Sequence, residues 1–417
     1  MSQADWERLQ YYSRKVKFFK ATTDTKDPQV HPSTYFRMAQ LQSSALFPSL
    51  RRLHYNLSNT SISDSHIFFF QSPFLDSLEF INIKGFENTI VGPFLATISS
   101  QAQMISRIVL RSGELSVDIL RNSVVHFKEL RSLELSDAVI MHNFGLWEDL
   151  GTLPSLENLT LVASDSACHP KRAPASDNSN SQSEGPSYFD ALERLCFTGS
   201  FFLVQHLLGF IDSPVLKSIK VYPIFNRSDL ESDEDPLTPS MTIIASKWST
   251  SLTDLVIGRN RVSNRSPISR CLMLLTDFHE MEVFQLIGWK MEDKADLGRL
   301  VLSWPKLETL KLNRTFTFLS TLRIIAENCP DLTVLEIPLN ASTIPSFDDD
   351  SIQRLDHDLQ FLTVGTVHPS QTTLELQIKV SRHLDLIFPN LEYLNVEDEN
   401  WAQVEDLYRL CQDVRQF

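Results

Sequence analysis

The chain has 417 residues, of which 42% are hydrophobic and 22% are charged, so it can bury a large core. Its 52 acidic residues outnumber its 38 Lys and Arg residues, which gives a formal net charge of −14. Because nucleic acids and anionic membranes repel such a chain, we expect neither nucleic acid nor a membrane as a partner.

The five cysteines indicate the cellular compartment. Their number is odd, their spacings are wide and no C-x-x-C pair occurs, which predicts a reducing environment without a disulfide framework or a zinc site. The opening sequence MSQADWERLQYYSRKVKFFK is charged and lacks the apolar core of a signal peptide. We therefore expect an intracellular protein, cytoplasmic or nuclear.

Residues 1–46 differ from the rest of the chain and are predicted to form an N-terminal cap with a degenerate first repeat. The segment ADWERLQYYSRKVKFF favours a helix from Asp5 to about Arg14. Val16 and Phe18 then alternate with charged residues, as in a short strand. A cap is required because an array of repeats exposes apolar edges at both ends.

Residues 47–399 contain thirteen copies of the apolar pattern L-x-x-L-x-L. The first apolar position of each copy is Leu50, Leu75, Ile105, Leu130, Leu156, Leu192, Leu216, Leu252, Met281, Leu307, Leu332, Leu359 and Leu391. Most intervals lie between 24 and 32 residues, and insertions explain the two of 36. This period is close to the roughly 20–29 residues of leucine-rich repeats.

Each copy combines a strand pattern with a helix pattern. In LETLKLN, Leu310 and Leu312 point to one side of a strand and Lys311 points to the other. Helical spacing of 4, 3 and 4 follows at Phe318, Leu322, Ile325 and Cys329. In seven copies, proline stands two residues before the first leucine, where it ends the helix and favours extended backbone.

A single copy cannot fold alone. Ordering its backbone costs about 1–2 kcal/mol per residue, whereas each buried apolar side chain returns about 1.5–3 kcal/mol. Stacking buries both flanks of each copy, so the sequence predicts an α/β fold, a leucine-rich-repeat solenoid. We expect a curved parallel β-sheet on the concave side and helices on the convex side. The alternative is a chance excess of leucine in an ordinary α/β protein.

Two insertions and one terminal segment interrupt or close the array. Residues 165–188 are rich in Ser, Pro and Asn and are predicted to be a disordered loop. Residues 226–240 are acidic and bounded by proline; Ser228 and Ser232 suit acidophilic kinases, and the alternative is a solvated loop. Residues 400–417 are predicted to be the C-terminal cap helix, with Trp401, Val404, Leu407, Cys411 and Val414 at helical spacing.

No catalytic or cofactor motif is visible. The chain has no G-x-S-x-G, no glycine-rich phosphate loop and no H-E-x-x-H. We therefore expect a protein that is not an enzyme, with no cofactor, metal or catalytic residue.

The solvent-facing positions of the strands predict the binding face. On the concave side the candidate partner-binding residues are Arg52, His54, Arg107, Arg111, Arg194, Lys220, Tyr222, Lys311 and Tyr393. Most basic members lie in the first half of a chain of negative charge, which favours an acidic segment of a protein partner. The alternative is a solvated face whose charges select no partner.

The opening segment carries a family resemblance. DWERLQYYSRKV matches D-W-x-R-[FL]-x-Y-Y-[AS]-x-[RK]-[VI], which opens the repeat array of basidiomycete-type fungal F-box proteins. The matching residues are Asp5, Trp6, Arg8, Leu9, Tyr11, Tyr12, Ser13, Lys15 and Val16. CPDLTVLEIPL after an amphipathic helix is also similar to the leucine-rich region of F-box proteins. The resemblance implies a solenoid that recognises substrates of a cullin-type ubiquitin ligase.

The F-box itself is not visible. In the family this three-helix module docks the ligase adaptor and usually opens with leucine-proline, whereas the first such pair here is Leu153-Pro154, inside a repeat. We expect the substrate-binding half alone, through a gene model that begins too late, a paralogue that lost the module, or a protein that never had one. The adaptor is a partner only if an F-box exists upstream.

Three functions follow as hypotheses. The first is a non-enzymatic recognition solenoid, an F-box-type substrate receptor or a derivative without the F-box. The second is a leucine-rich-repeat scaffold or adaptor unrelated to ubiquitin. The third is a protein like the GTPase regulators built on similar repeats, in which Arg107 or Arg111 supplies positive charge to phosphate.

Overall fold

The computed structural model describes residues 3–21, 45–57, 64–83, 88–112, 115–136, 143–163, 188–224, 237–259, 269–291, 294–344, 353–369 and 372–416. The predicted insertion at 165–188 lies outside the described residues except for Tyr188. The same holds for residues 226–236 of the predicted acidic insertion, and Thr238 within it begins a helix.

The described strands pair in parallel and in chain order within each of two compact units, with β12 beside β13. The N-terminal unit (Met1–Leu203 and Gly209–Val215) contains β1–β7, and the C-terminal unit (Val204–Leu208 and Leu216–Phe417) contains β8–β15. The strands are β1 (Phe18–Ala21), β2 (Arg52–Asn56), β3 (Ser77–Ile83), β4 (Arg107–Ser112), β5 (Ser132–Ser136), β6 (Asn158–Val162), β7 (Arg194–Ser200), β8 (Ser218–Ile224), β9 (Asp254–Ile257), β10 (Val283–Leu286), β11 (Thr309–Leu312), β12 (Thr317–Phe318), β13 (Val334–Asn340), β14 (Phe361–His368) and β15 (Tyr393–Val396).

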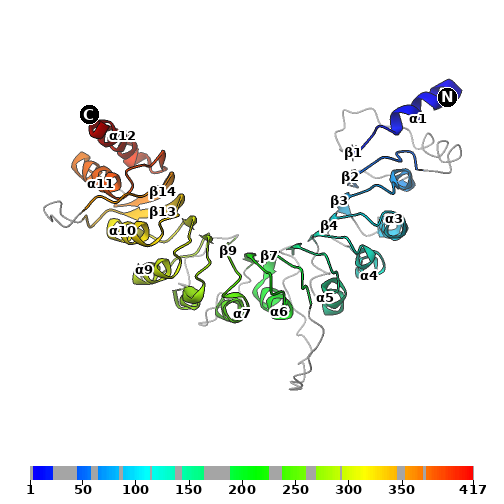
Figure 1. Ribbon diagram of the computed structural model, residues 1–417, viewed down its shortest axis with the longest axis horizontal. Coiled ribbons are helices and arrows are strands. Elements are labelled where there is room, and N and C mark those ends of the chain that lie inside the picture. Colours follow the sequence, from blue (N-terminus) through cyan, green and yellow to red (C-terminus); the bar gives the residue numbers. More distant parts are fainter. Residues whose placement is uncertain are drawn as a thin grey trace, which may run out of the picture. The chain divides into compact units, whose positions relative to one another are not determined.

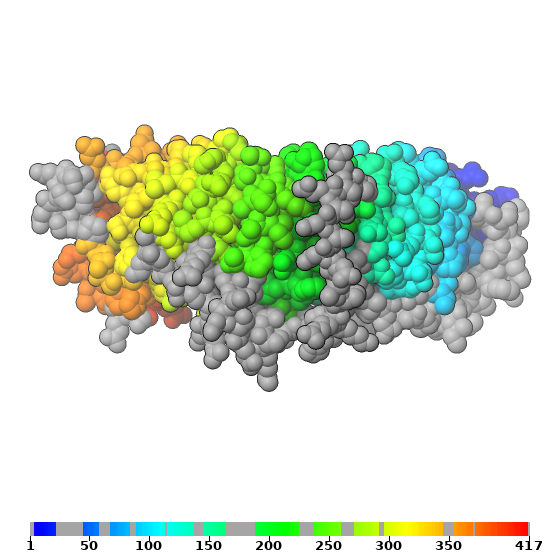
Figure 2. Space-filling model, turned by 90° about the horizontal axis from the view of Figure 1, so that it is seen from below, coloured from blue at the N-terminus to red at the C-terminus, as the bar shows by residue number. Residues whose placement is uncertain are grey.

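Within each unit the helices lie on one side of the strands, and successive segments lie side by side in chain order (Figures 1 and 2). The α-helices are α1 (Gln3–Ser13), α3 (Asn88–Gln101), α4 (Val117–Ser123), α5 (Phe144–Gly151), α6 (Phe201–Phe210), α7 (Thr238–Trp248), α8 (Ser269–Leu272), α9 (Lys294–Ser303), α10 (Leu319–Asn328), α11 (Leu374–Ile387) and α12 (Gln403–Gln416). Short 3-10 helices cover Asp64–Phe70 (η1), Val124–His126 (η3), Met273–Asp277 (η7) and Glu399–Trp401 (η8). The predicted α/β leucine-rich-repeat solenoid is confirmed.

The thirteen repeat copies predict the strands and the core. In every copy a strand begins two residues after the first apolar position, as β11 begins at Thr309 after Leu307. All thirteen first positions are buried, and none is more than 3% exposed. The apolar residues three and five positions later are also buried, except Val396 in β15, which is half-buried. The repeats therefore share their interior with their neighbours, which is how a solenoid gains stability.

Proline acts in a tight turn before the strand. The N–H of Leu50 donates to the carbonyl of Phe47 at 3.1 Å, which closes a β-turn with Pro48 at its second position. The same bond joins Leu307 to Trp304 at 3.2 Å. Proline suits this position because its fixed φ matches the turn and its missing N–H is not needed there. The turn, rather than helix termination alone, explains the recurring proline.

The two ends agree with the predicted patterns in most positions. Helix α1 covers the predicted N-terminal helix, and Phe18 opens β1, which pairs in parallel with β2. Near the C-terminus, Trp401 and Val404 are buried, but Val414 is 67% exposed. The predicted apolar stripe was wrong for that residue, because the buried face of α12 continues through Tyr408 instead. The Tyr408 hydroxyl donates to the Phe388 carbonyl at 2.6 Å.

Candidate functional site

The helix-free face of the strands presents side chains in rows, because neighbouring strands pair in register. We call the first residues of successive strands the first row. In the N-terminal unit the first row is Phe18, Arg52, Ser77, Arg107, Ser132, Asn158 and Arg194. In the C-terminal unit it is Ser218, Asp254, Val283, Thr309, Val334, Phe361 and Tyr393. The first row of the N-terminal unit thus carries three arginines, whereas the first row of the C-terminal unit is mainly apolar from Val283 onward.

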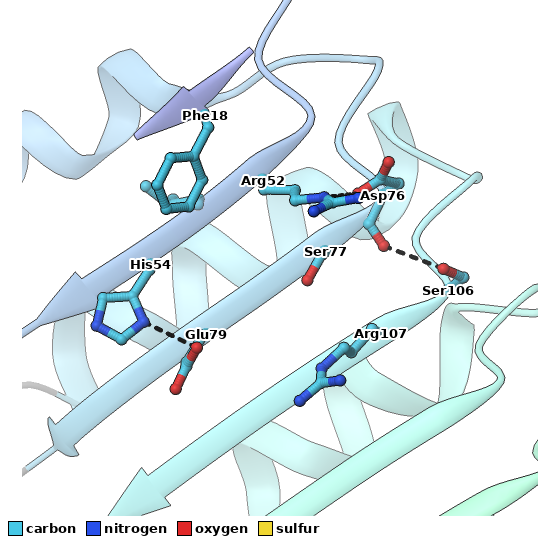
Figure 3. A pocket seen from close by; sticks show the side chains of 9 residues that line it. Phe18, Arg52, His54, Asp76, Ser77, Glu79, Ser106 and Arg107 are labelled. Atoms are coloured by element: carbon cyan, nitrogen blue, oxygen red, sulfur yellow. Dashed lines mark hydrogen bonds and ion pairs between the residues drawn. The ribbon is translucent and has the colours of Figure 1, made fainter. Parts of the chain in front are cut away.

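An open pocket of about 460 Å³ lies on this face of the N-terminal unit (Figure 3). It extends over β1, β2, β3 and β4. Its lining residues are Phe18, Arg52, Leu53, His54, Asp76, Ser77, Glu79, Ser106 and Arg107. Leucines behind the strands fix the strand positions, and the alternating residues in front therefore project into the pocket.

Ion pairs cross the strands beside the pocket. Glu79 accepts from His54 Nδ1 at 2.8 Å and lies 3.6 Å from Arg111 Nη1. Arg111 also donates from Nε to Glu134 at 2.8 Å, and this hydrogen bond is the main reason why its pKa is raised. Arg52 lies 3.9 Å from Asp76, a loose contact. Most charges on this part of the face are therefore paired with charges of neighbouring repeats.

Arg107 differs from the other basic residues of the pocket. It is exposed at the start of β4, and within the part of the chain that the structure describes no carboxylate forms an ion pair with it. Ser77 on β3 lies in register between Arg52 on β2 and Arg107 on β4. Two guanidinium groups on either side of a hydroxyl suit a carboxylate, since each component can donate a hydrogen bond to it.

The remaining predicted site residues lie apart from the pocket. In the N-terminal unit, Arg194 is 3.9 Å from its neighbour Glu193. In the C-terminal unit, Lys311 pairs with Glu336 at 3.3 Å. The structure therefore brings together four of the nine predicted residues: Arg52, His54 and Arg107 line the pocket, and Arg111 contacts Glu79 beside it.

The β8 residues of the predicted set have a different setting. Lys220 is exposed, and no ion pair joins it to any residue that the structure describes. Tyr222 is half-buried against Gly258, where a Cβ would approach its ring to 2.3 Å. Gly258 therefore leaves the space that the tyrosine ring fills.

Phe361 is a functional candidate that our sequence reasoning missed. It is 43% exposed at the start of β14, and its ring centroid lies 6.3 Å from that of Tyr393, which is 49% exposed. The repeat alignment contained the signal, because Phe361 stands two residues after Leu359, at the same place as Tyr393 after Leu391. An exposed aromatic pair on a strand face is typical of a binding surface.

The described residues contain no group of three or more His, Cys, Asp or Glu side chains placed to hold a metal ion. Across the same residues, no helix combines the length and apolar character needed to span a membrane.

Comparison with known proteins gives structural likenesses at low identity. No family model and no curated protein matches the chain. A chain of the yeast Rad7 and Elc1 complex matches with a TM-score of 0.42 at 13% identity, over 94% of this chain and 89% of that one. An internalin, InlF of Listeria monocytogenes, gives 0.39 at 13% identity, over 85% and 88%. The TLR13–ssRNA13 complex gives 0.36 at 15% identity, over 84% and 53%. Such values support no statement about function, and the leucine-rich-repeat architecture follows from the strand order and the buried repeat positions.

Proposed function

We propose that the chain is a non-enzymatic recognition solenoid that binds a partner protein on the helix-free face of its strands. One observation carries the proposal: the strands bury the apolar residues on one side, with Val396 alone half-buried among the repeat positions, and present partly exposed polar and aromatic side chains on the other. In the N-terminal unit, the pocket with Arg52 and Arg107 suits an acidic side chain of the partner.

Affinity purification of the full chain with mass spectrometry tests this proposal. The variant R52A/R107A removes both guanidinium groups, and R299A removes an exposed arginine on helix α9 as a matched control. Hydrogen bonds to charged groups contribute roughly 1.5–3 kcal/mol, so we expect R52A/R107A to reduce partner recovery at least tenfold. Equal recovery of every partner by the wild type and R52A/R107A would contradict the proposal for this pocket.

The finer hypothesis is a substrate receptor of a cullin-type ubiquitin ligase, or a derivative without the F-box. The opening segment supports it, since it resembles the start of the repeat array in fungal F-box proteins. Co-purification of the full-length native transcript product with a cullin adaptor tests the ligase hypothesis separately. Recovery of partners without any adaptor would reject the ligase role and leave a scaffold unrelated to ubiquitin.

The GTPase-regulator alternative depends on an arginine that can reach a phosphate. Arg111 is held by Glu79 and Glu134, so it would have to break both ion pairs first. Arg107 forms no such pair among the described residues. A GTP hydrolysis assay with R107A therefore separates this alternative from simple binding.

A further inference from the structure

In the C-terminal unit, the part of the first row from Val283 to Tyr393 forms a mainly apolar strip that ends in the exposed aromatic pair. Val283, Thr309 and Val334 are half-buried outward residues of β10, β11 and β13. Phe361 and Tyr393 continue the row on β14 and β15, with 43% and 49% of their surface exposed. Register pairing joins all five positions, so the strip is continuous across neighbouring strands.

Carboxylates border this apolar strip. Glu282, Glu308 and Glu392 each stand one residue before their strand, and Asp331 stands three residues before β13. Glu308, Asp331 and Glu392 are exposed, and Glu282 is half-buried. Within the described ranges no cation pairs with any of the four. Lys306, in the turn before β11, is already paired with Glu280 at 2.5 Å.

The charge distribution selects the chemistry of the partner. An acidic segment on this strip would place like charges together without counter-ions, which costs binding energy. A basic segment would pair with the free carboxylates while an apolar side chain covered the aromatic pair. The first row of the N-terminal unit has the opposite character, because it carries Arg52, Arg107 and Arg194.

We propose that this strip, from Val283 to Tyr393, binds an extended basic segment of a partner protein, with an apolar side chain of that segment between or against Phe361 and Tyr393. The inference rests on the proposed recognition function and names the partner chemistry for the C-terminal unit. Four strand spacings of about 4.8 Å give a strip roughly 19 Å long, which about six extended residues span.

Fluorescence anisotropy with the full chain and labelled eight-residue peptides tests the inference. The first peptide alternates lysine with phenylalanine and leucine, the second has glutamate in place of lysine, and the third has serine in place of the apolar residues. The variant F361S/Y393S removes the aromatic pair. The control L302S/I324S changes two exposed apolar residues, 61% and 38% exposed, in an apolar groove of about 510 Å³ between helices α9 and α10.

We expect the lysine–apolar peptide to bind the wild type at least tenfold more tightly than either other peptide. F361S/Y393S should weaken that binding at least tenfold, and L302S/I324S should change it less than twofold. Equal binding to F361S/Y393S, or equal binding of the glutamate peptide, would overturn the inference. Absence of binding by every peptide would also overturn it, while partner recovery by affinity purification would still support the recognition function. Loss of both readouts would reject the two together.

Discussion

Replacement of Leu307 by alanine tests whether neighbouring repeats share one interior. The Leu307 side chain is fully buried, as are the equivalent Met281 and Leu332 in the repeats before and after it. The substitution removes three buried carbon atoms, and at about 0.8 kcal/mol each the lost transfer free energy is about 2.4 kcal/mol. The cavity between rigid strands adds to this value, so we expect the free energy of unfolding to fall by about 3–4 kcal/mol.

The chain offers a matched control in the helix that precedes this repeat. Leu302 in helix α9 is 61% exposed, so L302A should change stability by no more than about 0.5 kcal/mol. Urea unfolding followed by circular dichroism measures both variants, and hydrogen exchange of β10, β11 and β13 locates the loss of protection. If L307A and L302A proved equally stable, the shared interior would be refuted.

Three further predictions concern buried contacts. Trp304 donates to the Leu275 carbonyl at 3.0 Å, so W304F should cost about 1–3 kcal/mol in urea unfolding, and a cost near zero would contradict the bond. G258A should lower the thermal unfolding midpoint because the added Cβ meets the Tyr222 ring, and the double variant G258A/Y222A should recover part of the loss. An unchanged midpoint for G258A would disprove the clash. Burial raises the pKa of the Cys329 thiol to about 12, so iodoacetamide at pH 8 should label this thiol only in urea. Peptide mass spectrometry measures the labelling, and labelling of the native chain would argue against burial.

Most of the fold could be predicted because each repeat encodes its own strand locally. The alternation in LETLKLN places Leu310 and Leu312 in the core and Lys311 on the other face, as the structure confirms. Helical spacing likewise predicted α10 from Leu322 and Ile325, both fully buried. The pattern failed at Val414 because the buried face of α12 runs through Val404 and Tyr408, which turns Val414 toward solvent.

The candidate site was predicted less well because its chemistry depends on neighbours in other repeats. The sequence predicted that Arg111 lies on the helix-free face. It did not predict the ion pairs of Arg111, because Glu79 and Glu134 come from the strands on either side. Counting basic residues therefore overestimated the free positive charge. Phe361 was missed although its repeat position equals that of Tyr393, because the exposure of its ring depends on side chains of neighbouring strands.

Register pairing between adjacent strands also bears on how such a chain can change over evolutionary time. Each described repeat must fit the one before it and the one after it, as β11 fits β10 and β13. A duplicated or deleted copy therefore has to satisfy two junctions, whereas an extra element in a closed globule must fit every surrounding element. Recombination between repeats is accordingly a tolerated route to new binding surfaces in this architecture.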